Sequence, residues 1–210
     1  MTRPVTCRVR PPPLSPCVPT ARHSYPLTHA PPSPAVTPQH WFYTPGDSLH
    51  SLSDLALFYH SSVGANAHLE IDFAVDRTGN MAPEHAALYS AFGGWIDACY
   101  RKQPLGRGFL APGEASVTLA IAGGEVDRVV LQEDQTGGQY VISYTVEAAV
   151  GGVWQPFSSG VTVGSKRIDV PKGGAVAGAT ALRLTVTEAF APGHAGVQIE
   201  ALSGEGCATE

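Results

Sequence analysis

The stretch Asp127–Ala148, DRVVLQEDQTGGQYVISYTVEA, decides the fold that this sequence predicts. Residues 127–132 and 140–148 are each expected to form a short β-strand, and apolar and polar residues alternate clearly over 142–148. The glycine pair Gly137-Gly138 between these segments is a turn signal. The stretch therefore predicts two consecutive strands joined by a turn.

The same pattern continues on both sides of this stretch. Further glycine pairs stand at 123–124, 151–152 and 173–174, and short alternating segments lie between them. The other segments that we expect to be strands are 116–121, 154–158, 160–163, 166–170, 182–187 and 197–202. Regular short strands separated by such turns predict an all-β antiparallel sandwich, which we assign to residues 105–206.

The residues before the predicted sandwich have a different period. Asp47 and Ser48 can cap a helix whose apolar residues recur at three- and four-residue steps, and Gly64 is expected to end it in a left-handed conformation. Residues 67–73 alternate like a strand, and Pro83 suits the first position of a second helix. The order helix, strand, helix is too small to close a core alone, so it indicates a slice of a larger α/β structure.

The first forty residues differ from the rest in composition. Residues 1–40 hold 11 of the 18 prolines and four arginines, but no Asp, Glu, Gly or Phe. Such a segment cannot bury enough apolar surface to offset its ordering entropy, so we predict that it is disordered. Prolines also interrupt residues 6–20, where the apolar core of a secretory signal peptide would lie.

Composition excludes two classes of function. The chain of 210 residues carries a formal net charge of −5, whereas non-specific binding of nucleic acid needs a basic surface. Its apolar runs are only a few residues long, far short of the ~20 residues that span a bilayer. The four cysteines and eight histidines show no metal-ligand spacing, so we expect neither a metal nor a cofactor.

Two pairs of carboxylates are candidates for chemistry. Glu70 and Asp72 share one face of the predicted strand at a spacing of roughly 7 Å, so they could act as acid and base or project into solvent. Glu133 and Asp134 could bind calcium or accept hydrogen bonds from backbone amides in a turn. For both pairs we favour the second, structural interpretation.

Two aromatic features are candidates for sugar binding. The run Trp41-Phe42-Tyr43 could stack on a sugar ring or anchor the chain in a core, and the residues alone do not decide between these roles. We expect Trp154 to pack inside the sandwich, because sandwich tryptophans of this kind more often fill the core.

Several segments, in collinear order over about 41–204, carry a resemblance to a known family. They are WFYTPGD (41–47), SLSDL (51–55), YHSSVGAN (59–66), DRTG (76–79), VDRVVLQED (126–134), YTVE (144–147) and GSKRI (164–168). Together they resemble the α-L-fucosidases of glycoside hydrolase family 29. The first four segments are similar to the end of the catalytic barrel in that family, and the others to its C-terminal β-sandwich.

The resemblance implies a fold and a function. Family members have a (β/α)8-like barrel followed by a β-sandwich, so 41–104 is expected to be an α/β remnant of the barrel with 67–73 as its final strand. Barrel enzymes hold their sites at the C-terminal ends of strands, which makes Trp41 and Asp72 the expected substrate-binding residues. The implied substrate is a fucosylated glycan, from which family members release terminal α-L-fucose with retention. Family members are commonly secreted or lysosomal.

The chain departs from the family at the catalytic carboxylates. Family 29 enzymes use an Asp nucleophile and a Glu acid/base, but no Asp or Glu precedes Asp47 here. We therefore assign no catalytic residue and expect the chain alone to be inactive towards fucosides. A truncated or mis-joined gene model would explain the change in composition at residue 40. The alternative function is a carbohydrate-binding or interaction module that works through the sandwich.

Overall fold

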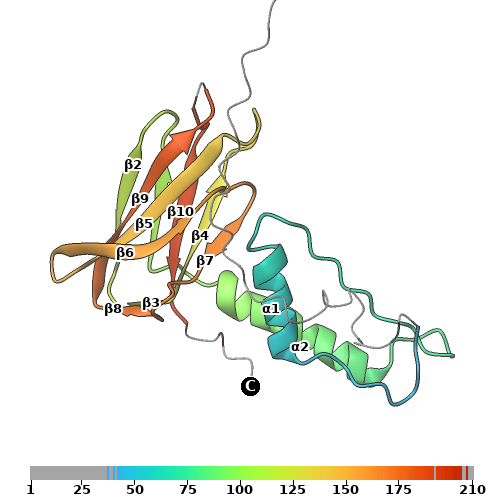
Figure 1. Ribbon diagram of the computed structural model, residues 1–210. Coiled ribbons are helices and arrows are strands. Elements are labelled where there is room, and N and C mark those ends of the chain that lie inside the picture. The colour runs from blue at the N-terminus through green and yellow to red at the C-terminus, as the bar shows by residue number, and fades with distance from the viewer. Residues whose placement is uncertain (1–36, 38–39, 41, 192, 205–206, 208–210) are drawn as a thin grey trace, which may run out of the picture. The chain divides into compact units, whose positions relative to one another are not determined.

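The computed structural model describes residues 37, 40, 42–191, 193–204 and 207 of the chain. The predicted disorder of 1–40 falls almost entirely outside the described residues, as does the proposed role of Trp41. Within the described part, two helices are followed by ten strands (Figure 1). No helix of that part is long and apolar enough to cross a membrane.

The strands form a β-sandwich of two four-stranded antiparallel sheets and a small two-stranded sheet (Figure 1). The first sheet has the order β1-β10-β4-β7, with β1 Gly106–Leu110, β10 Val197–Leu202, β4 Arg128–Glu133 and β7 Arg167–Asp169. The second has the order β2-β9-β5-β6, with β2 Ser116–Ala120, β9 Ala179–Ala189, β5 Val141–Val150 and β6 Val153–Gly160. The small sheet pairs β3 Glu125–Val126 with β8 Val176–Ala177. The predicted antiparallel sandwich is thus confirmed.

The alternation in the sequence is visible as burial. Along β5, Tyr144, Val146 and Ala148 point into the main core, where they meet Leu182 and Leu184 of the neighbouring β9. Inward residues of the facing sheet complete this core, namely Leu110, Val129, Leu131, Val197, Ile199 and Ala201. Burial of these side chains between two sheets is the main source of the sandwich's stability.

The structure contains strands that the pattern does not predict. Gly106 and Gly108 of β1 have no side chains from which a strand could be recognised in the sequence. Both glycines are nevertheless required, because neighbouring atoms approach the chain too closely for a Cβ. A Cβ at Gly106 would lie 2.5 Å from the carbonyl oxygen of Ala120, and one at Gly108 would lie 3.3 Å from the Cβ of Leu119. The strand predicted over 160–163 is wrong as a separate element, because β6 already ends at Gly160.

The first helix, α1 (Leu52–Ser62), starts later than predicted. Its N-cap is Ser51 rather than Asp47 or Ser48, because Ser51 and Asp54 form a reciprocal capping box that satisfies the first backbone amides.

Gly64, after this helix, has a different role from the predicted one. The left-handed residue is Asn66, with φ 64°, rather than Gly64. Gly64 is needed for space instead, since a Cβ there would lie 2.5 Å from the carbonyl oxygen of His60 and 3.0 Å from the Cβ of Ile168.

The second helix, α2 (Pro83–Tyr100), begins at Pro83 as predicted. Its apolar stripe and that of α1 pack against the outer side of the β1-β10-β4-β7 sheet, where they bury Val130, Ile168 and Leu202. The strand β4 is therefore buried on both faces over 128–131. That arrangement explains why β4 reads as a continuous apolar run rather than as a clean alternation.

The strand predicted over 67–73 is absent, so the predicted order helix-strand-helix is wrong in its middle element. Only Asp72 occupies a single bridge position in this segment. The alternation nevertheless governs burial, because Leu69, Ile71 and Phe73 are half-buried while the polar residues between them are exposed. A strand needs a ladder of backbone partners, and an alternating pattern supplies only the side-chain faces.

Candidate functional site

A shallow hollow of about 320 Å³ lies beside the segments that contain the two predicted substrate-binding residues. It is lined by Phe42, Tyr43, Ala74, Val75, Asp76 and Arg77. The aromatic side comes from the residues after Trp41, and the charged side comes from the loop after Asp72. An aromatic wall beside a carboxylate and a guanidinium is chemically suited to a sugar, which presents apolar ring faces and hydroxyl groups.

Asp76 is fixed in this hollow by a turn. Its Oδ1 accepts hydrogen bonds from the backbone N of Thr78 at 2.8 Å, from the hydroxyl of Thr78 at 2.6 Å and from the backbone N of Asn80 at 3.1 Å. These bonds, led by the one from the Thr78 hydroxyl, lower the pKa of Asp76. Gly79, with φ 84°, completes the turn over 76–79.

The two predicted binding residues are not brought together by the described structure. Trp41 lies outside the described residues, and Asp72 is exposed without lining the hollow. Glu70 is exposed as well, in the same loop. The role of Trp41 and Asp72 in substrate binding stays a prediction.

His85 is a residue that the sequence analysis missed. It is buried in the first turn of α2, with its ring centroid 6.1 Å from that of Tyr43 and 6.4 Å from that of Phe73. Its Nδ1 has no hydrogen-bond partner among the described residues. The signal was present in the sequence, because His85 precedes Phe92 and Cys99 by seven and fourteen residues and so belongs to the same helical stripe.

Glu133 and Asp134 both serve turns. Buried Glu133 accepts hydrogen bonds through Oε1 from the backbone N of Tyr140 (2.7 Å) and of Val141 (2.9 Å), and through Oε2 from that of Gly164 (3.4 Å). Asp134 binds the backbone and hydroxyl of Thr136. No group of three or more potential metal ligands occurs among the described residues. The backbone-turn interpretation is confirmed.

Replacing Glu133 by alanine should be strongly destabilising. The Glu133→Ala protein is expected to lose about 3 kcal/mol of unfolding free energy, because buried backbone amides are left without an acceptor. Chemical denaturation measures this loss. Asp134→Ala is the matched control, since Asp134 is exposed and binds only a local turn. An equal effect of the two substitutions would contradict the anchoring role of Glu133.

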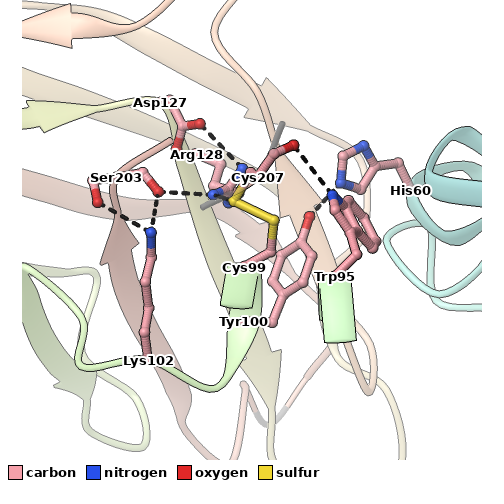
Figure 2. Close-up of polar contacts among 9 residues, drawn as sticks. All are labelled: His60, Trp95, Cys99, Tyr100, Lys102, Asp127, Arg128, Ser203 and Cys207. Carbon is pink, nitrogen blue, oxygen red and sulfur yellow. Dashed lines mark hydrogen bonds and ion pairs between the residues drawn. A yellow bond between two sulfur atoms is a disulfide. The ribbon is translucent and has the colours of Figure 1, made fainter. Parts of the chain in front are cut away.

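A buried cation lies where the helices meet the sandwich (Figure 2). Arg128 of β4 donates to Asp127 Oδ2 at 3.0 Å, to the Ser203 carbonyl at 2.7 Å and to Cys207 Sγ, and its guanidinium lies 5.2 Å from the ring centroid of Tyr100. Burial raises the pKa of Asp127, against the opposing effect of Arg128. These contacts tie the end of β10 to the end of α2.

A disulfide joins the same two places. Cys99, in the last turn of α2, is bonded to Cys207, 108 residues later in the chain, with a Cα–Cα distance of 5.0 Å. The Cys207 carbonyl also accepts a hydrogen bond from Trp95 Nε1 at 3.1 Å (Figure 2). Cysteine spacing alone gave no sign of this pairing, because the two residues meet only through the packing of α2 on the sheet.

His60 contributes a pH dependence to this region. Its ring binds the hydroxyl of Tyr100, and burial, reinforced by the charge of Arg128, lowers the pKa of His60 below its ordinary 6.5. Burial likewise raises the pKa of Tyr100. His60 is therefore neutral in the folded protein at neutral pH.

Stability should fall as His60 is forced to accept a proton. Because the folded pKa lies below the unfolded one, the unfolded chain binds more protons below about pH 6.5, and stability falls as pH decreases from there. Denaturation of the wild type and of His60→Gln between pH 7.5 and 5 isolates this contribution, since glutamine still reaches the Tyr100 hydroxyl. Parallel pH curves for the two proteins would contradict it.

Trp154 does not fill the core, so its predicted packing role is wrong. It is half-buried on the outer face of the second sheet, and the guanidinium carbon of Arg183 lies 4.4 Å from its ring centroid. Arg183 in turn pairs with Glu147 at 2.7 Å. The flanking turn at Gly151-Gly152 directs Trp154 to the outer face, because its register partner Ala149 also faces outward.

Several solved structures with a similar fold are assigned as α-L-fucosidases or as members of glycoside hydrolase family 29. Over 78% of its length the chain is similar to a protein assigned as an α-L-fucosidase from Bacteroides thetaiotaomicron VPI-5482, with 32% identity and a TM-score of 0.70. Over 81% it is similar to one so assigned from Bacteroides ovatus ATCC 8483, with 28% identity and a TM-score of 0.70. A glycoside hydrolase 29 family member from an unknown rumen bacterium matches 80% at 26% identity and a TM-score of 0.68.

The chain has the fold of the C-terminal part of family 29 α-L-fucosidases. It spans 37%, 30% and 31% of the lengths of these three relatives. Neither the comparison with protein-family models nor that with curated proteins finds a match. The resemblance to family 29 α-L-fucosidases read from the sequence motifs is therefore confirmed by the three-dimensional structure.

Proposed function

We propose that this chain forms the C-terminal part of a family 29 α-L-fucosidase, a retaining hydrolase that releases terminal α-L-fucose from glycans. The observation that carries the proposal is the match in fold and sequence to family 29 proteins over about four fifths of the chain. In this assignment the helices and the loop over 67–82 are the end of the catalytic barrel, and the hollow is part of its rim.

The solvent side of α2 supports its assignment to a larger structure. Apart from Tyr89 and the charged residues Glu84 and Asp97, the exposed residues within this helix are mostly small: Ala86, Ala87, Ser90, Ala91, Gly93, Gly94 and Ala98. An exposed helix face ordinarily carries several charged residues. A face of small side chains allows close approach of another backbone, as packing against the remainder of a barrel requires.

The two carboxyl groups needed for retaining hydrolysis are not assigned to this chain. Retaining glycosidases hold them roughly 5–5.5 Å apart across the scissile bond. Glu70 and Asp72 are the candidates by spacing, but both project from an exposed loop and neither lines the hollow. Asp76 lines the hollow, but its Oδ1 is occupied by the turn.

Hydrolysis of 4-nitrophenyl α-L-fucoside tests the proposal. The purified full chain should release no nitrophenolate above the buffer rate, while the intact Bacteroides thetaiotaomicron relative, under the same conditions, serves as the reference. Turnover by the chain that disappears in the double variant Glu70→Gln/Asp72→Asn would overturn the proposed absence of catalytic carboxylates.

A carbohydrate-binding role is the second candidate. It is favoured by Phe42, which is 85% exposed beside the hollow, and by the half-buried Trp154 on the sandwich. Calorimetric titration of the full chain with L-fucose distinguishes a binding site at the hollow from one on the sandwich. Loss of binding in Phe42→Ala assigns it to the hollow, loss in Trp154→Ala assigns it to the sandwich, and absence of binding in the wild type excludes this role for L-fucose.

A further inference from the structure

We propose that the Cys99–Cys207 disulfide is a redox-sensitive clasp that holds the C-terminal segment and α2 against the sandwich, and that a dithiol reductant opens it. The segment of this clasp comprises Ser203, Gly204 and Cys207, which follow β10. The clasp is separate from the hollow and does not depend on the proposed hydrolase function.

The first support is the position of the two cysteines. Cys99 is fully buried in the helical core with Trp95 and Phe92, and Cys207 belongs to the segment beyond the last strand. Other contacts of Cys207 are hydrogen bonds, among them those from the Trp95 indole to its carbonyl, from Arg128 to its Sγ and from its own amide to the Gly204 carbonyl. The disulfide is the covalent link between this segment and α2.

The second support is the buried charge beneath the segment. Arg128 is 4% exposed, and two of its hydrogen-bond acceptors, the Ser203 carbonyl and Cys207 Sγ, belong to the clasp (Figure 2). Its Nε has no partner among the described residues. Burial of a guanidinium costs free energy that these acceptors offset, and once the covalent bond is broken water can replace the Ser203 carbonyl and Cys207 Sγ as acceptors.

The chemistry of opening is ordinary thiol–disulfide exchange. A thiolate of the dithiol attacks one sulfur, a mixed disulfide forms, and the second thiol of the reductant closes its own disulfide. The reductant loses two electrons and two protons, and Cys99 and Cys207 receive them as thiols. Cys99 is fully buried in the helical core, whereas Cys207 leaves with the segment, so Cys207 is the more accessible thiol once the bond is broken.

The first test is peptide mapping of the full chain purified without reductant. Mass spectrometry should find Cys99 and Cys207 in one disulfide-linked peptide pair. Recovery of both residues as alkylated free thiols would overturn the proposal.

Thermal unfolding tests the function of the bond. Dithiothreitol should lower the Tm of the wild type by about 10 °C, as expected for a crosslink closing a loop of this length. Cys7→Ser/Cys17→Ser is the matched control and should keep the full response, whereas Cys99→Ser/Cys207→Ser should show none. A wild-type shift below about 1 °C would overturn the proposal, and because it is measured on the wild type, it does not depend on the variants folding.

Hydrogen exchange and alkylation give readouts specific to a clasp. Reduction should speed amide exchange in 89–100 and at Ser203 and Gly204 but leave β5 and β9 unchanged, and uniform acceleration would contradict a local opening.

In the reduced wild type, iodoacetamide at pH 7 should modify Cys207 at least about fivefold faster than Cys99. Equal rates at the two thiols would contradict release of the segment.

Discussion

The Trp95→Ala protein is expected to lose about 4 kcal/mol of unfolding free energy, a loss typical of deleting a buried large aromatic side chain. Trp95 is buried at the centre of the helical core, with its ring stacked on Phe92 at 6.0 Å between centroids and edge-on to Tyr59 at 5.8 Å. The substitution also removes the donor to the Cys207 carbonyl. Chemical denaturation followed by circular dichroism measures the loss.

Two variants separate the contributions of Trp95. Trp95→Phe keeps an aromatic ring in the core but not the indole donor, so it should cost only about 1–2 kcal/mol. Trp154→Ala removes a tryptophan that belongs to neither core and should cost about 1 kcal/mol or less. If Trp95→Ala were no more destabilising than Trp154→Ala, the helical core would not be a source of stability.

The Asp169→Ala protein is expected to lose about 3 kcal/mol, because the substitution breaks a half-buried ion pair and leaves the buried Tyr144 hydroxyl without its acceptor. Asp169 of β7 is buried and accepts three hydrogen bonds, each 2.8 Å long, from Arg167 Nε, the Tyr144 hydroxyl and the Ser158 hydroxyl. These bonds link β7 in one sheet to β5 and β6 in the other. Burial and the charge of Asp169 together raise the pKa of Tyr144, so its hydroxyl remains a donor.

The control for Asp169 is an ion pair of similar geometry at the surface. Arg107 and Glu200 pair across β1 and β10 at 2.7 Å, with the Arg107 side chain 62% exposed. Arg107→Ala should cost less than about 1 kcal/mol, because water screens and replaces an exposed pair. Urea denaturation of both variants makes the comparison, and equal losses would show that Asp169 does not link the two sheets.

Most of the sandwich could be predicted because its signals are local. The alternation over 142–148 corresponds to β5, and the turn signal at Gly137-Gly138 lies between β4 and β5. The start of α2 at Pro83 was also predicted, and its buried residues Phe92, Trp95 and Cys99 recur at helical spacing. Each of these patterns depends only on residues within one or two turns of one another.

The candidate site could be predicted only in part. The segments 41–47 and 76–79 were singled out by the family resemblance, and Phe42, Tyr43, Asp76 and Arg77 from them line the hollow. His85 was missed because histidine is a polar residue type. Its burial in the apolar stripe of α2 becomes apparent only when the packed helix is seen. Trp154 was predicted to face the core, but it faces outward. The sequence of a short strand does not show which face of that strand meets the other sheet.

By itself, the sequence determined the period of each segment, the positions of most turns, the start of α2 at Pro83 and the likeness to family 29 fucosidases. The tertiary structure decided that 67–73 is a loop, that glycine-rich β1 is a strand, and that Cys99 pairs with Cys207. The physical reason is that alternation states which side chains become buried, whereas a backbone ladder or a disulfide needs a partner from a distant part of the chain. That partner is present only after the helices have packed on the sheet.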